Sequence, residues 1–68
     1  MMKKVSSTSI GEVGFDNGDL HVVFKQSQKH YVYHGVNEDT YGELLEASSI
    51  GRFVNAEIKD NYNYDLIS

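Results

Sequence analysis

The sequence predicts an α+β fold, in which a three-stranded antiparallel β-meander is followed by two short helices packed on one face of the sheet. Three observations predict it. Residues 11–34 alternate apolar and polar side chains, as half-buried strands do. Residues 37–62 carry apolar side chains at helical spacing. Between the first two alternating runs lies Asn17-Gly18, the strongest short signal for a hairpin.

The alternating runs span residues 11–15, 20–25 and 30–34, and the last two are rich in β-branched and aromatic residues. Asn17-Gly18 suits a two-residue type I′ turn, because both central positions of that turn need a positive φ. Residues 26–29 suit a four-residue hairpin loop between the second and third strands.

Asn37 predicts the start of the first helix, because its side chain can accept from a free backbone N–H. Acidic residues 38–39 follow in the first turn, where negative charge suits the helix dipole. Tyr41, Leu44 and Leu45 then form one apolar stripe.

Ser48 and Ser49 interrupt this stripe, and either can cap a second helix. The apolar residues of that second helix are Ile50, Phe53, Val54 and Ile58, with Tyr62 one turn beyond. Residues 63–68 are expected to be a fraying tail or a short extra segment.

The two hairpin turns predict which residues face each other. The first turn pairs Val13 with Val22, and the second loop pairs Lys25 with His30 and Val22 with Tyr33. Both registers give the same apolar face, which should pack under the helices. Its members are Val13, Phe15, Leu20, Val22, Phe24, Tyr31 and Tyr33.

All three histidines fall on the opposite face of the predicted sheet. His21 is expected directly across from His34, with Cβ atoms about 5 Å apart. Such a pair with a nearby carboxylate could hold a weakly bound zinc ion. The alternative is an ordinary solvated face, and no metal ligand is assigned. A partner protein, or a second copy of the chain, could instead cover Val23 and Val32 on this face.

The composition limits the possible functions. A chain of 68 residues without cysteine is expected to be a single domain, with its core at residues 5–62 and flexible ends. The net charge of −4 divides into +1 for residues 1–34 and −5 for residues 35–68. This distribution argues against electrostatic binding of duplex DNA over a broad surface but permits a small anionic ligand. No targeting signal or apolar span is visible, so a cytoplasmic location is expected.

Several short segments occur in a characteristic order. They are residues 5–10, 13–16, 20–24, the Tyr-x-Tyr segment 30–36, and the spaced residues Tyr41, Leu44, Leu45, Ala47, Ser49, Gly51, Phe53, Asn55 and Ile58. This series resembles the KTSC domain, a family named for the C-terminus of some lysyl-tRNA synthetases, over residues 5–62. The family also occurs as small stand-alone bacterial and phage proteins. The resemblance implies no established activity, although an RNA-binding role has been suggested.

The chain departs from the family pattern in three places, and none of them touches a known chemistry. Gln28 stands in a hairpin loop where glycine is common, and Asn37 follows Val36 where proline is expected. Phe15 replaces a more usual tyrosine.

Three groups of residues are candidates for ligand binding. Tyr31 and Tyr33 could stack on bases, although the predicted register places them on the core face. Ser48, Ser49, Gly51 and Arg52 could hold a phosphate at the start of the second helix, or be an ordinary cap with an exposed arginine. Lys25 and Lys29 flank the second hairpin loop, where the N-terminal serines also lie. They could attract an anion or simply be soluble surface.

The expected function is a small non-enzymatic binding module for RNA or a nucleotide-like anion, with no cofactor. No P-loop, HExxH or GxSxG motif is present, and residues 38–46 place their carboxylates on a solvated helix face. One alternative is a protein-interaction or self-associating module that uses the exposed sheet face. A further alternative is a phage-type protein that sequesters a nucleotide immune signal. No membrane association is expected.

Overall fold

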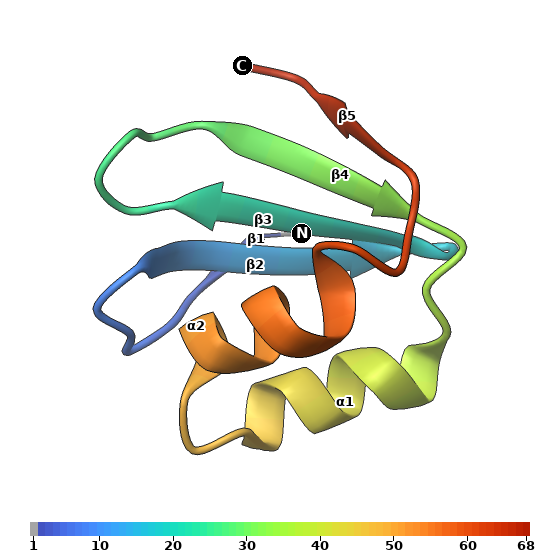
Figure 1. Cartoon of the computed structure of the whole chain (residues 1–68), viewed down its shortest axis with the longest axis horizontal. Helices are drawn as coiled ribbons and strands as arrows, with labels where there is room; N and C mark the ends of the chain where they lie inside the picture. The colour runs from blue at the N-terminus through green and yellow to red at the C-terminus, as the bar shows by residue number, and fades with distance from the viewer. Residues whose placement is uncertain (1) are drawn as a thin grey trace.

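The chain forms one antiparallel sheet with a helical layer on one side of it (Figure 1). The structure is a computed structural model that describes residues 2–68, so Met1 of the expected domain lies outside the described residues. In chain order the elements are β1 (Met2–Lys4), β2 (Ile10–Asp16), β3 (Asp19–Phe24), β4 (His30–His34), α1 (Glu38–Glu46), α2 (Ile50–Phe53), η1 (Val54–Ile58) and β5 (Tyr64–Leu66).

The α+β class is confirmed, but the expected number of three strands is wrong. The sheet has five strands in the order β1-β2-β3-β4-β5, and every neighbouring pair is antiparallel. The two additional strands are the outer ones, and each has three residues. Both lack the alternating pattern: β1 reads Met-Lys-Lys, and all of β5 is exposed.

The first hairpin is as predicted. Asn17 and Gly18 have φ values of 53° and 89°, which is the backbone of a type I′ turn. Val13 pairs with Val22, and Phe15 pairs with Leu20. Closer to its start, β2 contains a register shift between Ile10 and Glu12. This bulge turns Ile10 toward the helices, where it is buried although the alternation alone would place it on the opposite face.

The second hairpin differs from its predicted register. The Phe24 N–H donates to the Lys29 carbonyl, so the loop contains residues 25–28 and starts one residue earlier than expected. Val22 therefore pairs with Tyr31, and Val23 pairs with His30. The partners move by two residues along β4, and an even shift leaves every side chain on its predicted face.

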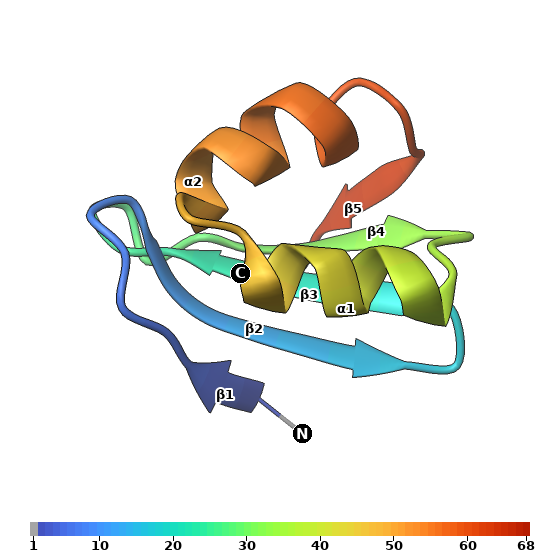
Figure 2. The same cartoon turned by 90° about the horizontal axis from the view of Figure 1, so that it is seen from below.

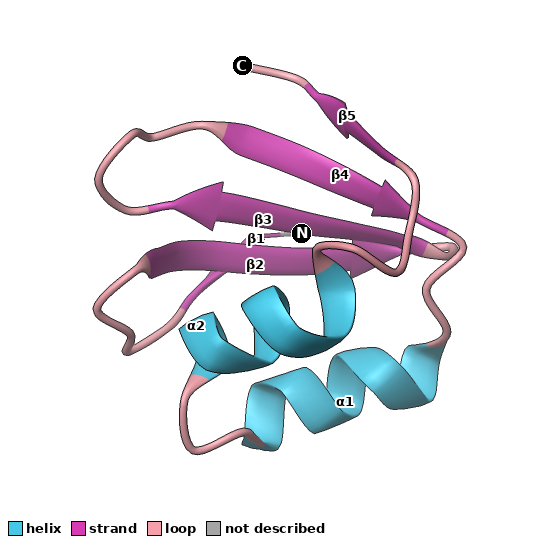
Figure 3. Cartoon of the chain, viewed as in Figure 1, coloured by secondary structure: helices cyan, strands magenta, loops and turns pink. Residues whose placement is uncertain are grey.

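Both predicted helix starts are present. The Asn37 side chain accepts from the Thr40 N–H at 2.8 Å, and the Ser49 hydroxyl accepts from the Arg52 N–H at 3.3 Å. The second helix begins as α2 and continues without a break as the π-helical turn η1 (Figure 3). In this turn the Lys59 N–H donates to the Val54 carbonyl, five residues earlier.

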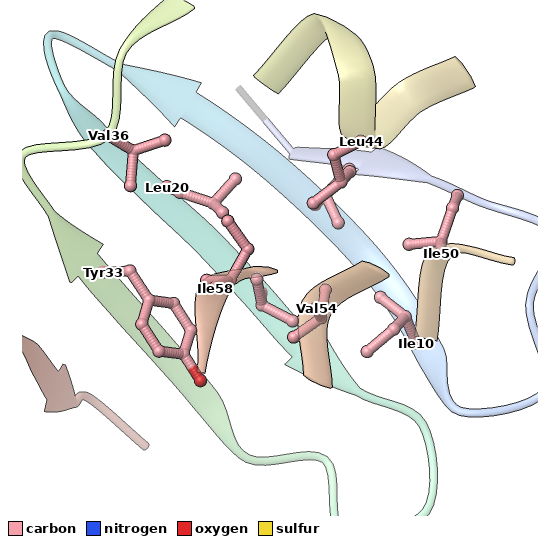
Figure 4. Packing of buried hydrophobic residues seen from close by; sticks show 10 residues of the cluster. Ile10, Leu20, Tyr33, Val36, Leu44, Ile50, Val54 and Ile58 are labelled. Carbon is pink, nitrogen blue, oxygen red and sulfur yellow. The ribbon is translucent and has the colours of Figure 1, made fainter. Parts of the chain in front are cut away.

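The core lies between the sheet and the helices. Figure 2 shows the α2–η1 segment on one side of the sheet. The buried cluster contains Ile10, Val13, Leu20, Val22, Tyr33, Val36, Leu44, Ile50, Val54 and Ile58. Figure 4 shows residues of α1, α2 and η1 meeting residues of β2, β3 and β4, with Tyr33 on the β4 side of the cluster. No helix within residues 2–68 is both long and apolar enough to cross a bilayer.

Candidate functional site

An aromatic cluster lies on the helix-facing side of β4 and β5. Tyr31 is its centre: its ring stacks on Tyr33 at 6.3 Å between centroids and meets Phe24 edge-on at 5.5 Å. Tyr64 of β5 contacts both tyrosines, with centroids 5.5 Å from Tyr31 and 5.7 Å from Tyr33. The cluster continues the core toward the edge of the sheet, because Tyr33 is buried, Tyr31 is half-buried and Tyr64 is exposed.

These four rings line one wall of a hollow of about 480 Å³, which we call the aromatic hollow. Polar residues from three other segments complete it. They are Thr8 and Ser9 before β2, Gln26, Ser27 and Lys29 between β3 and β4, and Lys59 and Asp60 after η1. The hollow therefore combines flat apolar rings with two ammonium groups and one carboxylate. This combination suits a ligand with a planar part and an anionic part.

Burial raises the pKa of the Tyr33 hydroxyl, and the charges of Tyr31, Tyr64 and Asp60 raise it further. Like any tyrosine hydroxyl it is protonated near neutral pH, and it can donate a hydrogen bond. Because Tyr33 lines the aromatic hollow, that donor is available to an acceptor oxygen of a ligand.

A second hollow of about 400 Å³ lies between the segment before β2 and the loop that joins α1 to α2. We call it the hydroxyl hollow, because most of its lining residues carry a hydroxyl group. It is lined by Ser6, Ser7, Thr8, Lys25, Ser48, Ser49 and Ile50. Lys25 is held in place, since its Nζ donates to the Ser7 carbonyl at 2.6 Å and its N–H donates to the Ser9 carbonyl at 2.8 Å.

The predicted ligand-binding residues are thus divided between the two hollows. Tyr31, Tyr33 and Lys29 line the aromatic hollow. Lys25, Ser48 and Ser49 line the hydroxyl hollow, which brings the second and third candidate groups together. Tyr33 is a core residue that also lines the aromatic hollow, so a place in the core does not prevent it from contacting a ligand.

Gly51 and Arg52 are placed differently from expectation. A Cβ on Gly51 would collide with the Ser9 hydroxyl, so the close approach at this glycine is made by the chain itself and not by a ligand. Arg52 is exposed on α2, and it lines neither hollow. Of this candidate group, only Ser48 and Ser49, which precede α2, line a cavity within the described residues.

Sequence reasoning missed Tyr64, Lys59 and Asp60, which also line the aromatic hollow. Tyr64 lies in the segment expected to be a fraying tail or a short extra segment, and its place depends on the pairing of β5 with β4. The extra residue of the π-helical turn η1 shifts the chain that follows it relative to an α-helix, and Lys59 and Asp60 come directly after that turn. The sequence did offer one signal, an aromatic residue six positions after the last core residue, Ile58.

On the opposite face of the sheet, the predicted His21–His34 pair is wrong. The altered register places His21 across from Val32, and Asp19 across from His34. His21 instead contacts His30, with Nδ1 and Nε2 2.8 Å apart. Burial lowers the pKa of His21, and the neighbouring His30 lowers it further. Residues 2–68 contain no group of three or more side chains placed to hold a metal ion.

His34 lies between two carboxylates. Its Nδ1 is 3.0 Å from Asp19 and its Nε2 is 2.8 Å from Asp65. The hydrogen bond with Asp19, followed by that with Asp65, raises the pKa of His34. Val32 is only 4% exposed, although this face has no helix over it. Of the two valines expected to contact a partner there, only Val23 is even partly accessible.

Comparison with known proteins gives a consistent result. The family model described as the KTSC domain matches residues 6–62. Among solved structures, a KTSC domain protein from Yersinia pestis is 31% identical, with a TM-score of 0.94. The match covers all of this chain and 97% of that one. A search of curated proteins found no match.

Proposed function

This chain belongs to the KTSC domain family, and we propose that it is a non-enzymatic binding module whose aromatic hollow takes a nucleotide, free or within single-stranded RNA. One observation carries the proposal. Four aromatic rings and two lysines, from five separate segments of the chain, line the same hollow of about 480 Å³. Aromatic rings stack on any nucleic-acid base, and ammonium groups bind phosphate.

The geometry assigns a part to each side of the hollow. Tyr64 is 54% exposed, so its ring can accept a base without unpacking the core. Lys29 and Lys59 are exposed lysines on two different segments, and they can contact the phosphate from two directions. The Tyr33 hydroxyl, which lines the hollow, can donate to a base carbonyl or a phosphate oxygen.

Fluorescence polarisation with a labelled single-stranded RNA tests this proposal. Tyr64→Ala removes an exposed ring, and stacking is worth about 1–3 kcal/mol per base, so affinity should fall at least about fivefold. The matched control is Ile67→Ala, since Ile67 is equally exposed at 56% but does not line the hollow. Equal binding by both variants, or wild-type binding that is insensitive to salt, would contradict the proposal.

Charge gives a second test of the same site. Lys59→Ala should weaken binding and reduce its dependence on salt, because one phosphate contact is lost. Lys3→Ala is the control, since Lys3 is an exposed lysine of β1 and lines neither hollow. If both substitutions weaken binding equally, the ligand is attracted by overall charge and not by this hollow.

A second candidate function is self-association through β5. This edge strand exposes Tyr64 and Leu66, and Ile67 follows it directly. Each of these three residues is at least 50% exposed. Unpaired strand edges with exposed apolar residues favour pairing with another strand, here that of a second copy. Sedimentation velocity should then show a dimer that Leu66→Lys disrupts. A monomer at high concentration would reject this candidate and leave the first untouched.

A further inference from the structure

We infer that the hydroxyl hollow is a phosphate subsite next to the aromatic hollow, so that the preferred ligand is two nucleotides joined by a phosphodiester. The inference rests on the proposed function, because the first nucleotide is the one placed in the aromatic hollow. It assigns a role to Lys25, Ser48 and Ser49 that the aromatic hollow does not need.

The two hollows are adjacent. Thr8 lines both of them. The β3–β4 loop also reaches both, since Lys25 lines the hydroxyl hollow while Ser27 and Lys29 line the aromatic hollow. A ligand can therefore pass from one hollow to the other across Thr8 without leaving the surface.

The chemistry of the hydroxyl hollow favours an anion rich in acceptor oxygens. The Ser7 oxygen accepts from the N–H groups of Ser9 and Ile10, at 3.3 Å and 3.2 Å. The Ser49 oxygen accepts from the Arg52 N–H. Each oxygen therefore already accepts a hydrogen bond, and the hydroxyl proton of each remains available to a ligand.

Lys25 supplies the charge. One of its three ammonium protons is donated to the Ser7 carbonyl at 2.6 Å, which leaves two donors on a group that is already held in position. Among the residues that line the hydroxyl hollow there is no carboxylate, although residues 35–68 as a whole carry an excess of acids. Lys25 therefore faces Ser48 and Ser49 of the acidic second half across a hollow whose described lining carries no negative side chain.

The two hollows divide the ligand between them. The aromatic hollow has rings for a base, whereas Ile50 is the only apolar residue among residues 2–68 that lines the hydroxyl hollow. A single nucleotide uses the first hollow alone. A second nucleotide extends the ligand across Thr8, and its phosphate contacts Lys25 and the serine hydroxyls.

Isothermal titration of the whole chain with adenosine monophosphate, linear 5′-phosphorylated diadenylate and cyclic diadenylate tests the inference. We expect a dinucleotide, linear or cyclic, to bind at least tenfold more tightly than the mononucleotide. The linear and cyclic arms distinguish an RNA strand from a soluble nucleotide signal as the source of the same chemistry.

Ser48→Asp tests whether the tighter binding of the dinucleotide comes from the hydroxyl hollow. Ser48 is exposed, and the substitution places a carboxylate in the hydroxyl hollow, so the tenfold preference for the dinucleotide should be lost while mononucleotide binding is unchanged. Ser68→Asp adds the same charge outside both hollows and should leave the preference intact.

The possible outcomes are separable. If mononucleotide and dinucleotide bind equally, or if Ser48→Asp retains the preference, the subsite is wrong and the proposed function stands. If no nucleotide binds at all, the proposed function fails and the subsite fails with it.

Discussion

Gly51→Ala tests a close approach between α2 and the segment before β2. In a helix, alanine is more favourable than glycine by about 1 kcal/mol, so an unobstructed site would be stabilised. Here the new Cβ would collide with the Ser9 hydroxyl oxygen, while it would lie 3.6 Å from Ser9 Cβ, an ordinary contact. The obstruction is therefore one atom.

The magnitude follows from that single atom. The obstructing oxygen ends an exposed side chain, so it can rotate away at a cost of about 0.5–1.5 kcal/mol. Set against the gain in helix propensity, Gly51→Ala should change stability by no more than about 0.5 kcal/mol in either direction. In the Ser9→Ala background the collision is absent, and the same substitution should stabilise the chain by up to about 1 kcal/mol.

Urea unfolding of the four chains, followed by far-ultraviolet circular dichroism, measures the coupling between the two positions. Ser9→Ala is a clean partner, because the Ser9 carbonyl that accepts from Lys25 is retained. We expect a coupling free energy of roughly 0.5–1.5 kcal/mol, the cost of rotating the Ser9 hydroxyl away. Additive effects, within about 0.3–0.5 kcal/mol, would refute the argument that Ser9 is what demands glycine at position 51.

Three further outcomes follow from the structure. Gln28 has φ 59°, a backbone conformation that favours glycine, so Gln28→Gly should stabilise the chain by about 0.5–1 kcal/mol. Thermal unfolding should then show a Tm raised by several degrees. A lower Tm would mean that the exposed hydrogen bond from the Gln28 side chain to the Lys25 carbonyl outweighs the backbone strain. Leu44 is fully buried, so Leu44→Ala should cost about 2–5 kcal/mol in urea unfolding; a loss below about 1 kcal/mol would show that the core is loosely packed there. The pKa of His34 is raised in the folded state, so its stabilising effect is complete below its ordinary value of 6.5 and is lost as pH rises through the folded value. His34→Gln should therefore destabilise the chain more at about pH 5 than at about pH 9, and an equal effect at both would exclude a charged pair with Asp19 and Asp65.

The strong local signals predicted the centre of the fold. Asn17-Gly18 permits the positive φ values of the first turn, and Asn37 and Ser49 cap the helices because their side chains can replace missing backbone partners. The period of two predicted every core face position of β3 and β4, because an even register shift does not move a side chain to the other face.

The remainder depended on contacts that local sequence does not encode. The second loop starts one residue earlier than the sequence predicts and contains Gln28 in a left-handed conformation. This difference shifts the pairing of β3 with β4, so His21 contacts His30 and not His34. β5 has no alternation, and it becomes a strand only because β4 offers it an edge. The candidate site was predicted in part for the same reason: Tyr31, Tyr33 and Lys29 carry local signals, whereas Tyr64 reaches the hollow through β5.

The exposed strand β5 also couples ligand affinity to local unfolding. It has three residues, all of them exposed, and such segments detach at a lower free-energy cost than the core of a sheet. Tyr64 leaves the aromatic hollow whenever β5 detaches, so the competent fraction of molecules is the fraction with this strand in place. A ligand that contacts Tyr64 must therefore slow hydrogen exchange at the Ile67 amide, which donates to the His30 carbonyl in the same edge pairing.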